Sequence, residues 1–214
     1  MRDRYREYFE RTGTAIELVG PSLHLRYLRL DDAPPILELL GDPDVPRFFL
    51  WEPPRDLEEA RQYVQGFQQE VYHQRAYHFA VVGSGREALL GVANLYHIDP
   101  LAREAEIGIW LGRAYWGQGV QRQVNHLLLE FGFRTLQLRR IIFRVAVENA
   151  RAQAAFRKLG ATQDGRVQLF SRRQNQMVEH LVYGLKAVDW QAALQRSAIS
   201  SQRSATAPND LADR

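Results

Sequence analysis

The sequence predicts a single α/β domain built around a mixed β-sheet, and three observations favour this fold class. Strand-like and helix-like spacings of apolar residues alternate along the chain, in the order β-α-α-β-β-β-α-β-α-β-β. The run IIFRVAV at 141–147 is β-branched and almost continuously apolar, which is typical of a strand in a parallel pair. The 214 residues, 45% of them hydrophobic, suffice for one sizeable core.

The first strand and helix are indicated by different periodicities. Leu23, Leu25 and Tyr27 alternate with polar residues, which predicts a half-buried strand. A short helix is expected at 33–40, where two prolines fall in the first turn and are tolerated there.

A longer amphipathic helix is predicted at 57–73, because apolar residues recur there at helical spacing. Asp56 and Glu59 form the pattern of a capping box at its start. The SGRE turn at 84–87 predicts a hairpin between two of the strands that follow. Those strands are expected at 77–82, 88–95 and 104–111.

The second half of the chain again alternates between predicted helices and strands. A glycine-bearing turn at 115–119 precedes an amphipathic helix, and the apolar strand at 141–147 comes next. A helix at 150–159 then ends at Gly160, a typical C-cap residue. Two last strands are expected at 166–172 and 178–186.

The amino-acid composition limits the classes of function that the protein can have. The net charge is +3 without a dense Lys/Arg block, so an anionic cofactor explains the basic balance as well as a nucleic acid would. The sequence has no cysteine, which excludes disulfides, a catalytic thiol and cysteine-based metal sites. The six histidines show no metal-ligand spacing, so no metal is expected.

The two ends of the chain differ from its middle. We expect an N-terminal extension at 1–13, the folded domain at 14–190 and a disordered, Ser/Ala-rich tail at 191–214. Residues 1–11 are charged and lack the apolar region of a signal peptide, and no apolar run reaches the length of a membrane span. These features favour a cytoplasmic protein without a membrane partner.

The segment EIGIWLGRAYWGQGVQRQV at 106–124 is the most informative one for function. It reads as a strand, a tight turn with Gly117 and Gly119, and a helix. Glycines let the backbone approach a ligand closely, and the helix start offers unpaired N–H groups that suit a pyrophosphate. The alternative is a corner that needs glycine only for its turn. Gly-Lys-Ser/Thr is missing, so the segment is not a Walker loop.

Asn149 lies where the apolar strand meets the following helix. An asparagine there caps the helix. A functional role would add a side-chain amide that faces a groove between two parallel strands.

Taken together, these segments resemble the GNAT superfamily of N-acetyltransferases, and within it the RimJ/RimL-like group. The resemblance covers about residues 16–190. It is carried by LHLRYLRLDDAPPILELLGDPDV, AEIGIWLGRAYWGQG, VENARAQAAFRKLGA and the closing GRVQLF…EHLVYGLKAVDW. The resemblance implies a GNAT-like, mostly antiparallel twisted sheet with splayed central strands and flanking helices.

The resemblance also implies acetyl-CoA as the acyl donor and direct attack by an amine, without an acyl-enzyme. The expected acceptor is a protein N-terminus or a small amine, a homodimer is possible in such a group, and nucleic acid is not expected as a partner. The cofactor-binding residues that it implies lie on the strand, on the glycine loop and at the next helix. They are the backbone of Ile109, Trp110 and Leu111, the loop Trp116, Gly117, Gln118, Gly119, Val120 and Gln121, and Asn149.

Glu106 lies where many relatives carry a carboxylate base, which the chemistry needs because an alkylamine is mostly ammonium at neutral pH. Its alternative role is a surface ion pair, for example with Arg103. A general acid for the leaving thiolate is expected at Tyr183, with Tyr115 or water as alternatives.

Three positions depart from the pattern of the group. Gln121 replaces a small residue in the phosphate loop, and Phe156 and Ala152 stand where relatives carry a tyrosine or a serine. These departures motivate an alternative function, a non-catalytic acyl-CoA-binding module with the same fold. Trp51 either lines a substrate pocket or packs, and the Arg-rich stretch 134–140 is a solvated turn or a partner for the 3′-phosphate of CoA.

Overall fold

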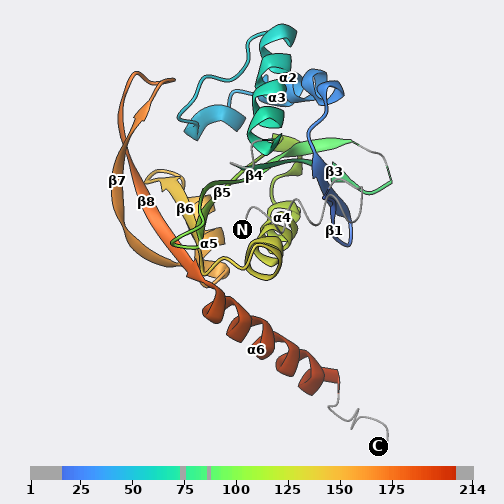
Figure 1. The fold of residues 1–214 in the computed structure, drawn as a ribbon, viewed down its shortest axis with the longest axis vertical. Helices are drawn as coiled ribbons and strands as arrows, with labels where there is room; N and C mark the ends of the chain where they lie inside the picture. Colours follow the sequence, from blue (N-terminus) through green and yellow to red (C-terminus); the bar gives the residue numbers. More distant parts are fainter. Residues whose placement is uncertain (1–15, 73–75, 86–87, 206–214) are drawn as a thin grey trace, which may run out of the picture.

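The computed structural model describes residues 16–72, 76–85 and 88–205 (Figure 1). The strands in this part are β1 (Leu18–Val19), β2 (Leu23–Tyr27), β3 (Tyr77–Gly83), β4 (Leu89–Asp99), β5 (Glu104–Leu111), β6 (Arg140–Ala146), β7 (Thr162–Ser171) and β8 (Gln176–Lys186). The helices are α2 (Ala33–Leu40), α3 (Leu57–Tyr72), α4 (Val120–Glu130), α5 (Ala150–Lys158) and α6 (Ala187–Ala205). Short turns η1 (Leu30–Asp32), η2 (Val45–Phe48), η3 (Arg113–Tyr115) and η4 (Phe131–Thr135) connect them.

The eight described strands form one sheet in the order β1-β2-β3-β4-β5-β6-β8-β7. Neighbouring strands are antiparallel except for β5 and β6, which are parallel. The predicted mixed, mostly antiparallel sheet is therefore confirmed, and so is the parallel partner expected for the apolar run at 141–147.

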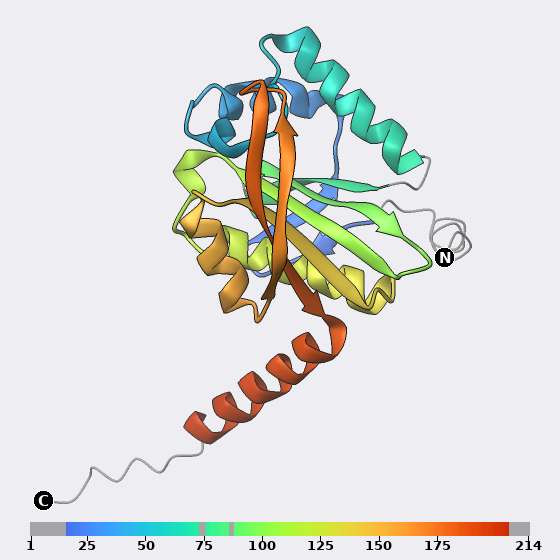
Figure 2. The same cartoon turned by 90° about the vertical axis from the view of Figure 1, so that its left-hand side faces the viewer.

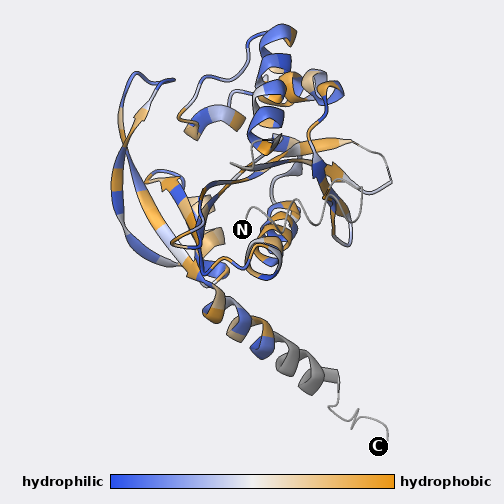
Figure 3. Ribbon diagram, in the orientation of Figure 1, coloured by the Kyte–Doolittle hydropathy of each residue, from blue (hydrophilic) through white to orange (hydrophobic). Residues whose placement is uncertain are grey.

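Helices cover both faces of the sheet (Figure 1). Successive strand residues point to opposite faces, so Phe79 lies in the core beneath α4 and α5, whereas Ala80 lies in the core beneath α2 and α3. Figure 3 shows that the central strands carry most of the hydrophobic residues. The β7–β8 hairpin lies at the left edge of the molecule in Figure 1 and runs across its front in Figure 2.

The local predictions hold with small shifts. Helix α2 and strand β5 have the predicted bounds. The Asp56 carboxylate accepts the backbone N–H of Glu59 at 2.9 Å, but the Glu59 carboxylate accepts from the N–H of Arg55 and not from that of Asp56. The second hydrogen bond of the capping box is thus made by the N–H of Arg55, one residue before the predicted Asp56. Residues 73, 86 and 87, at the end of the predicted helix and hairpin turn, lie outside the described residues.

Helix α6 continues to Ala205, through part of the segment 191–214 that is expected from the sequence to be a tail. Trp190 is 4% exposed and packs near Phe133, with 5.4 Å between the ring centroids, which anchors the first turns of the helix. Alanine, glutamine and arginine then favour continued helix without an apolar face. The expected extension at 1–13 and the last residues, 206–214, lie outside the described residues.

Candidate active site

The two parallel strands separate soon after they meet. β5 and β6 pair only over Glu104 to Glu106, opposite Arg140 to Ile142. Beyond Glu106, β5 stays paired with β4 up to Leu111, and β6 stays paired with β8 up to Ala146. The β5 backbone groups that face away from β4 are therefore left without a strand partner, and an extended ligand can use them. Ile109, Trp110 and Leu111 lie in this stretch, although the indole N–H of Trp116 already donates to the carbonyl of Leu111 at 2.8 Å.

The glycine loop follows directly. Gly117 and Gly119 have left-handed backbones with φ of 75° and 78°, and no atom lies within 4 Å of the place where either Cβ would stand. The backbone N–H of Trp116 donates to Arg113 and that of Gln123 donates to Gly119.

Between these two residues, the backbone N–H groups of 117–122 have no acceptor among the described residues. Gly119 is the N-cap of α4, so the partial positive end of the helix faces the same place. An anion such as a diphosphate suits this cradle, and contacts from residues 116–121 to a cofactor stay a prediction.

Gln121 lies in the first turn of α4, and Asn149 is the N-cap of α5. Gln121 is half-buried, and its side-chain amide makes no hydrogen bond with the described residues. The Oδ1 atom of Asn149 accepts the backbone N–H of Ala152 at 3.1 Å, so the expected capping role is present. Its amide nitrogen makes no hydrogen bond within the described part of the chain, and a cofactor contact for it stays a prediction.

Arg151 is a neighbour of the loop that sequence reasoning missed. Its guanidinium lies 3.7 Å from the ring centroid of Trp116, a cation–π contact that joins α5 to the start of the loop. Partial burial lowers the pKa of Arg151, but a guanidinium remains protonated in proteins. A positive charge therefore stands beside the cradle. An arginine two residues after the N-cap Asn149 is the signal that could have found it.

Glu106 lies at the point where the strands separate, and only 5% of it is exposed. The Tyr96 hydroxyl donates to its Oε1 atom at 2.8 Å, and the Arg144 guanidinium forms an ion pair with its Oε2 atom. The Nδ1 atom of His97 lies 3.3 Å from the same Oε2. The suggested ion pair with Arg103 is wrong, because the Arg103 guanidinium donates to a backbone carbonyl, that of Gln137.

The environment of Glu106 keeps its neighbours in defined protonation states. Burial, together with the charge and hydrogen bond of Glu106, raises the pKa of Tyr96, so this phenol stays protonated and donates. A Cβ at Gly108 would lie 2.9 Å from the Tyr96 ring, so glycine there makes room for that ring. His180 is 5% exposed, and burial lowers its pKa.

Tyr183 does not lie beside Glu106. Glu106 and Ile142 are strand partners and share a face of the sheet, whereas Tyr183 lies opposite Phe143 and shares the other face. Tyr183 is 1% exposed, and its hydroxyl accepts a hydrogen bond from Arg157 at 3.1 Å. The structure thus places this candidate acid in the core beneath α5.

Phe156 and Ala152, the two departures on α5, belong to that same core. Phe156 is 8% exposed and stacks on Phe143, with 4.5 Å between the ring centroids. Ala152 is half-buried and packs against this core. The position where relatives carry a tyrosine is therefore filled here by a packing residue.

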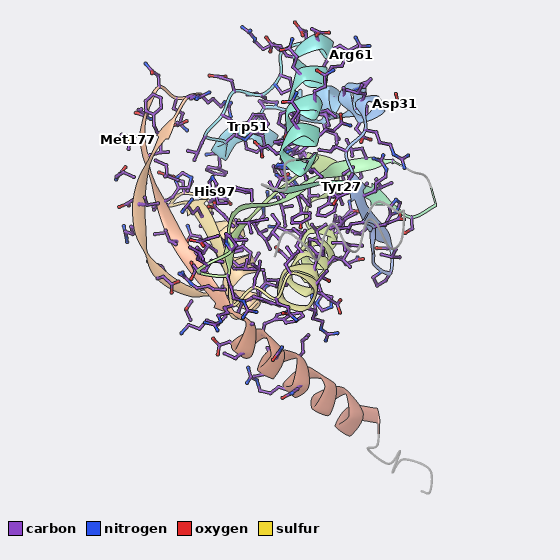
Figure 4. All side chains as sticks on the ribbon, viewed as in Figure 1. Tyr27, Asp31, Trp51, Arg61, His97 and Met177 are labelled. Atoms are coloured by element: carbon purple, nitrogen blue, oxygen red, sulfur yellow. The ribbon has the colours of Figure 1, made fainter. Side chains whose placement is uncertain are left out.

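The face of the sheet that carries Glu106 is bordered by an aromatic cluster and by the hairpin tip. Trp51 stacks between Phe49 and Tyr63, with centroids 4.7 and 5.1 Å away, which favours packing over the pocket role. The backbone N–H of Arg172 donates to the carbonyl of Leu50 at 2.8 Å, so the hairpin meets the segment before Trp51. In Figure 4, Trp51, His97 and the hairpin residue Met177 border the same side of the molecule.

The described part of the chain holds neither a metal-binding cluster nor a membrane-spanning helix. No group of three or more His, Asp or Glu side chains is placed to hold a metal ion there. Over the same residues, no helix is long and apolar enough to cross a membrane.

Comparison with known proteins identifies this arrangement. A family model for the acetyltransferase (GNAT) domain matches residues 22–162. An uncharacterized N-acetyltransferase, p20, of Bacillus licheniformis is 26% identical over 163 residues, which are 76% of this chain and 92% of that protein. A ribosomal-protein-serine acetyltransferase of Escherichia coli is 34% identical over 101 residues, 47% of this chain and 55% of that protein.

Solved structures share the fold. A spermidine N-acetyltransferase from Vibrio cholerae, solved in complex with CoA and spermine, has a TM-score of 0.69 and 21% identity. The match covers 80% of this chain and 99% of that one. The fold and the matched domain define an N-acetyltransferase. The chain belongs to the GNAT acetyltransferase family, as the resemblance in its sequence predicts.

Proposed function

We propose that this protein transfers the acetyl group of acetyl-CoA to a primary amine, either a protein N-terminus or a small amine. The observation that carries the proposal is the separation of β5 and β6 directly after Glu106. This separation lines up three features along one opening, namely the carboxylate, the unpaired β5 backbone and the glycine loop. The relatives named above act on a ribosomal protein or on spermidine, which supports an amine acceptor in either size class.

Acetyl-CoA supplies the activated acyl group when it is bound. We assign its diphosphate to the N–H groups of residues 117–121, since that of Trp116 already donates to Arg113, and its extended arm to the backbone of Ile109, Trp110 and Leu111. Backbone N–H near Leu111 would polarise the thioester carbonyl as it becomes an oxyanion. The sequence has no cysteine for an acyl-thiol intermediate, which agrees with direct attack by the amine.

Glu106 is assigned to the acceptor. Its carboxylate holds the ammonium by charge and receives the proton that must leave before the nitrogen can attack. Arg144 and Tyr96 fix the orientation of this carboxylate through the ion pair and the hydrogen bond described above.

Protonation of the leaving thiolate is the least constrained step. The burial of Tyr183 and its position on the opposite face from Glu106 make it a poorer candidate than its chemistry alone suggests. Water or Tyr115, which lies half-buried before the loop, is the alternative. A CoA thiolate is a tolerable leaving group, so a weak acid slows the reaction without preventing it.

The second candidate function is an acyl-CoA-binding module without turnover. The packing of Phe156 and Ala152 favours it, since neither side chain can donate a proton. Both functions require the same cofactor site, so cofactor binding alone does not separate them.

Two measurements test the proposal. Millimolar acetyl-CoA should raise the melting temperature by several degrees through mass action, whereas NAD and ATP should not. Thiol release is then followed with a panel of polyamines, small amines and peptides with free N-termini, and products are identified by mass spectrometry. Stabilisation without thiol release on any amine would favour the binding module, and absence of stabilisation would refute both functions.

A further inference from the structure

We propose that His97 is the proton exit of the active site, a positioning residue that takes the acceptor's proton from Glu106 and delivers it to solvent. This inference rests on the proposed function, because it concerns the fate of a proton in that reaction. It is carried by the geometry of the end of β4, where His97 and Tyr96 both reach one carboxylate.

Adjacent residues of a regular strand point to opposite faces and do not contact the same side chain. β4 departs from this rule because its register with β5 shifts between Tyr96, opposite Glu106, and Asp99, opposite Glu104. Two residues of β4, His97 and Ile98, therefore stand against one residue of β5. Such a bulge re-aims a side chain, and here it turns His97 towards Glu106.

The backbone of His97 supports a functional reason for this bulge. Its φ is 50°, in the left-handed region that residues other than glycine rarely adopt. Conformations of this kind persist where the surrounding structure holds them, and they cluster at functional sites. The Tyr96 ring lies against the imidazole, with centroids 4.7 Å apart, and holds it in place.

The balance of the reaction requires a route for one proton. An ammonium acceptor and acetyl-CoA give an amide, a free thiol and one proton. The ammonium nitrogen first transfers a proton to the Glu106 carboxylate. The free amine then forms the C–N bond while the C–S bond breaks, and the second proton that the nitrogen loses passes to the thiolate. The proton on Glu106 must leave before the next turnover, yet only 5% of this residue is exposed.

The other polar neighbours of Glu106 are poor exits. Burial and the charge of Glu106 raise the pKa of Tyr96, which prevents this phenol from cycling through its ionised form. The guanidinium of Arg144, from β6, does not give up its proton at accessible pH. His180, from β8, is buried, and its Nδ1 atom faces the carbonyl of Val178 at 3.5 Å.

His97 differs from these groups in the two properties that an exit needs. Its side chain is 69% exposed, so solvent reaches the imidazole while Nδ1 stays 3.3 Å from Glu106. Imidazole has two nitrogens, one of which can accept a proton while the other releases one. Of the described side chains in polar contact with Glu106, it is the one that joins the carboxylate to water in this way.

The test replaces His97 by glutamine, which keeps a polar side chain but cannot relay a proton. At low buffer concentration we expect kcat of His97→Gln to fall on the order of 10²-fold, with the KM values for amine and acetyl-CoA unchanged. N-methylmorpholine, a tertiary amine that cannot form a stable amide, should restore turnover of the variant as its concentration rises. The wild-type rate should not depend on that buffer.

His126→Gln is the matched control, because His126 is exposed on α4 and its ring lies near Trp190, not near Glu106. It should behave as wild type in both buffers. The melting temperature and acetyl-CoA affinity of each variant show whether a loss of turnover reflects folding or binding.

The outcomes separate this inference from the function on which it rests. A wild-type protein that acetylates no amine refutes the proposed function and this inference together. An active wild type with an unimpaired His97→Gln variant, or with an impaired variant that buffer does not restore, overturns the proton exit and leaves the function standing.

Discussion

Glu106 combines low exposure with three polar neighbours from two strands, Tyr96 and His97 from β4 and Arg144 from β6. A carboxylate so enclosed is fixed in orientation and is poised at the opening between β5 and β6. Under the proposed function, this one side chain would both hold the ammonium ion and take its proton.

Replacing Glu106 by glutamine should therefore impair the chemical step. We expect Glu106→Gln to lower kcat by roughly 10²-fold, with acetyl-CoA affinity unchanged because the phosphate cradle is separate. Steady-state kinetics and calorimetric titration measure the two effects. Glu179→Gln, in the β7–β8 ion pair with Arg166, is the control for loss of a carboxylate. Equal activity of Glu106→Gln and wild type between about pH 6 and 9 would remove Glu106 from the mechanism.

Gln121 is the loop position where the chain departs from its group. Its amide makes no hydrogen bond with the described residues, so it is available to a phosphate oxygen. We expect Gln121→Ala to weaken acetyl-CoA binding by roughly 1.5–3 kcal/mol, the range for a charge-assisted hydrogen bond. Gln123→Ala is the control. Gln123 lies on the same helix as Gln121, but its side-chain oxygen already accepts a hydrogen bond from the Ser22 hydroxyl at 3.0 Å. Tighter binding by Gln121→Ala in calorimetry would mean that the side chain obstructs the cradle.

The sequence singles out the loop and Asn149 through short local patterns, and Glu106 through the resemblance to the family. It does not reveal the partners of Glu106, since Arg144 lies 38 residues away and meets it only through the register of β5 and β6. The same reason explains why Arg103 was the wrong partner. Sequence proximity favours it, but the left-handed backbone of Arg103, with φ of 58°, accompanies a contact with Gln137 instead.

At the level of elements, the turn between η3 and α4 depends on left-handed glycines. Gly119→Ala adds no steric contact, but its φ of 78° is unfavourable for any residue with a Cβ, at about 1–2 kcal/mol. We expect the free energy of unfolding, measured with denaturant, to fall by that amount. Acetyl-CoA should also bind more weakly.

Gly66→Ala is the control, because we expect it to change the stability of the protein in the opposite direction. Gly66 lies inside α3 with no neighbour within 4 Å of an added Cβ, so alanine there should stabilise the protein by about 0.5–1 kcal/mol. If Gly119→Ala is as stable as wild type, the turn can adopt a different backbone and the cradle is not preorganised.

The helices and strands with clear periodicity were predictable to within a few residues, and α2 and β5 were predicted without error. Two kinds of element were not. The bulge at His97 arises from the pairing of β4 with β5 and leaves no mark in local composition. Helix α6 has few apolar residues after Leu194, so its sequence is equally typical of a tail.

At the level of the whole molecule, His180 links stability to pH. Burial lowers the pKa of His180 in the folded protein below its ordinary value of about 6.5. As the pH falls below that value, the unfolded chain binds a proton that the folded protein binds less readily, so stability decreases. We expect His180→Gln to lose less stability than wild type between about pH 7 and 5 in denaturant titrations. His126→Gln, at an exposed site, should retain the wild-type dependence. An unchanged slope in His180→Gln would assign the acid sensitivity to other groups.

The short contact between β5 and β6 has a mechanical consequence. The sheet consists of two half-sheets, β1–β5 and β6–β8, whose strands share only three residue pairs, with a second link from the hairpin tip to Leu50. Fluctuations that open this seam should cost less free energy than global unfolding. A cofactor held both by β5 and by Asn149, which follows β6, would bridge the seam. Hydrogen exchange should therefore slow on both sides of it when acetyl-CoA binds, including in β6, which the cofactor need not touch. Protection confined to the loop at 116–121 would show that the halves already move as one body.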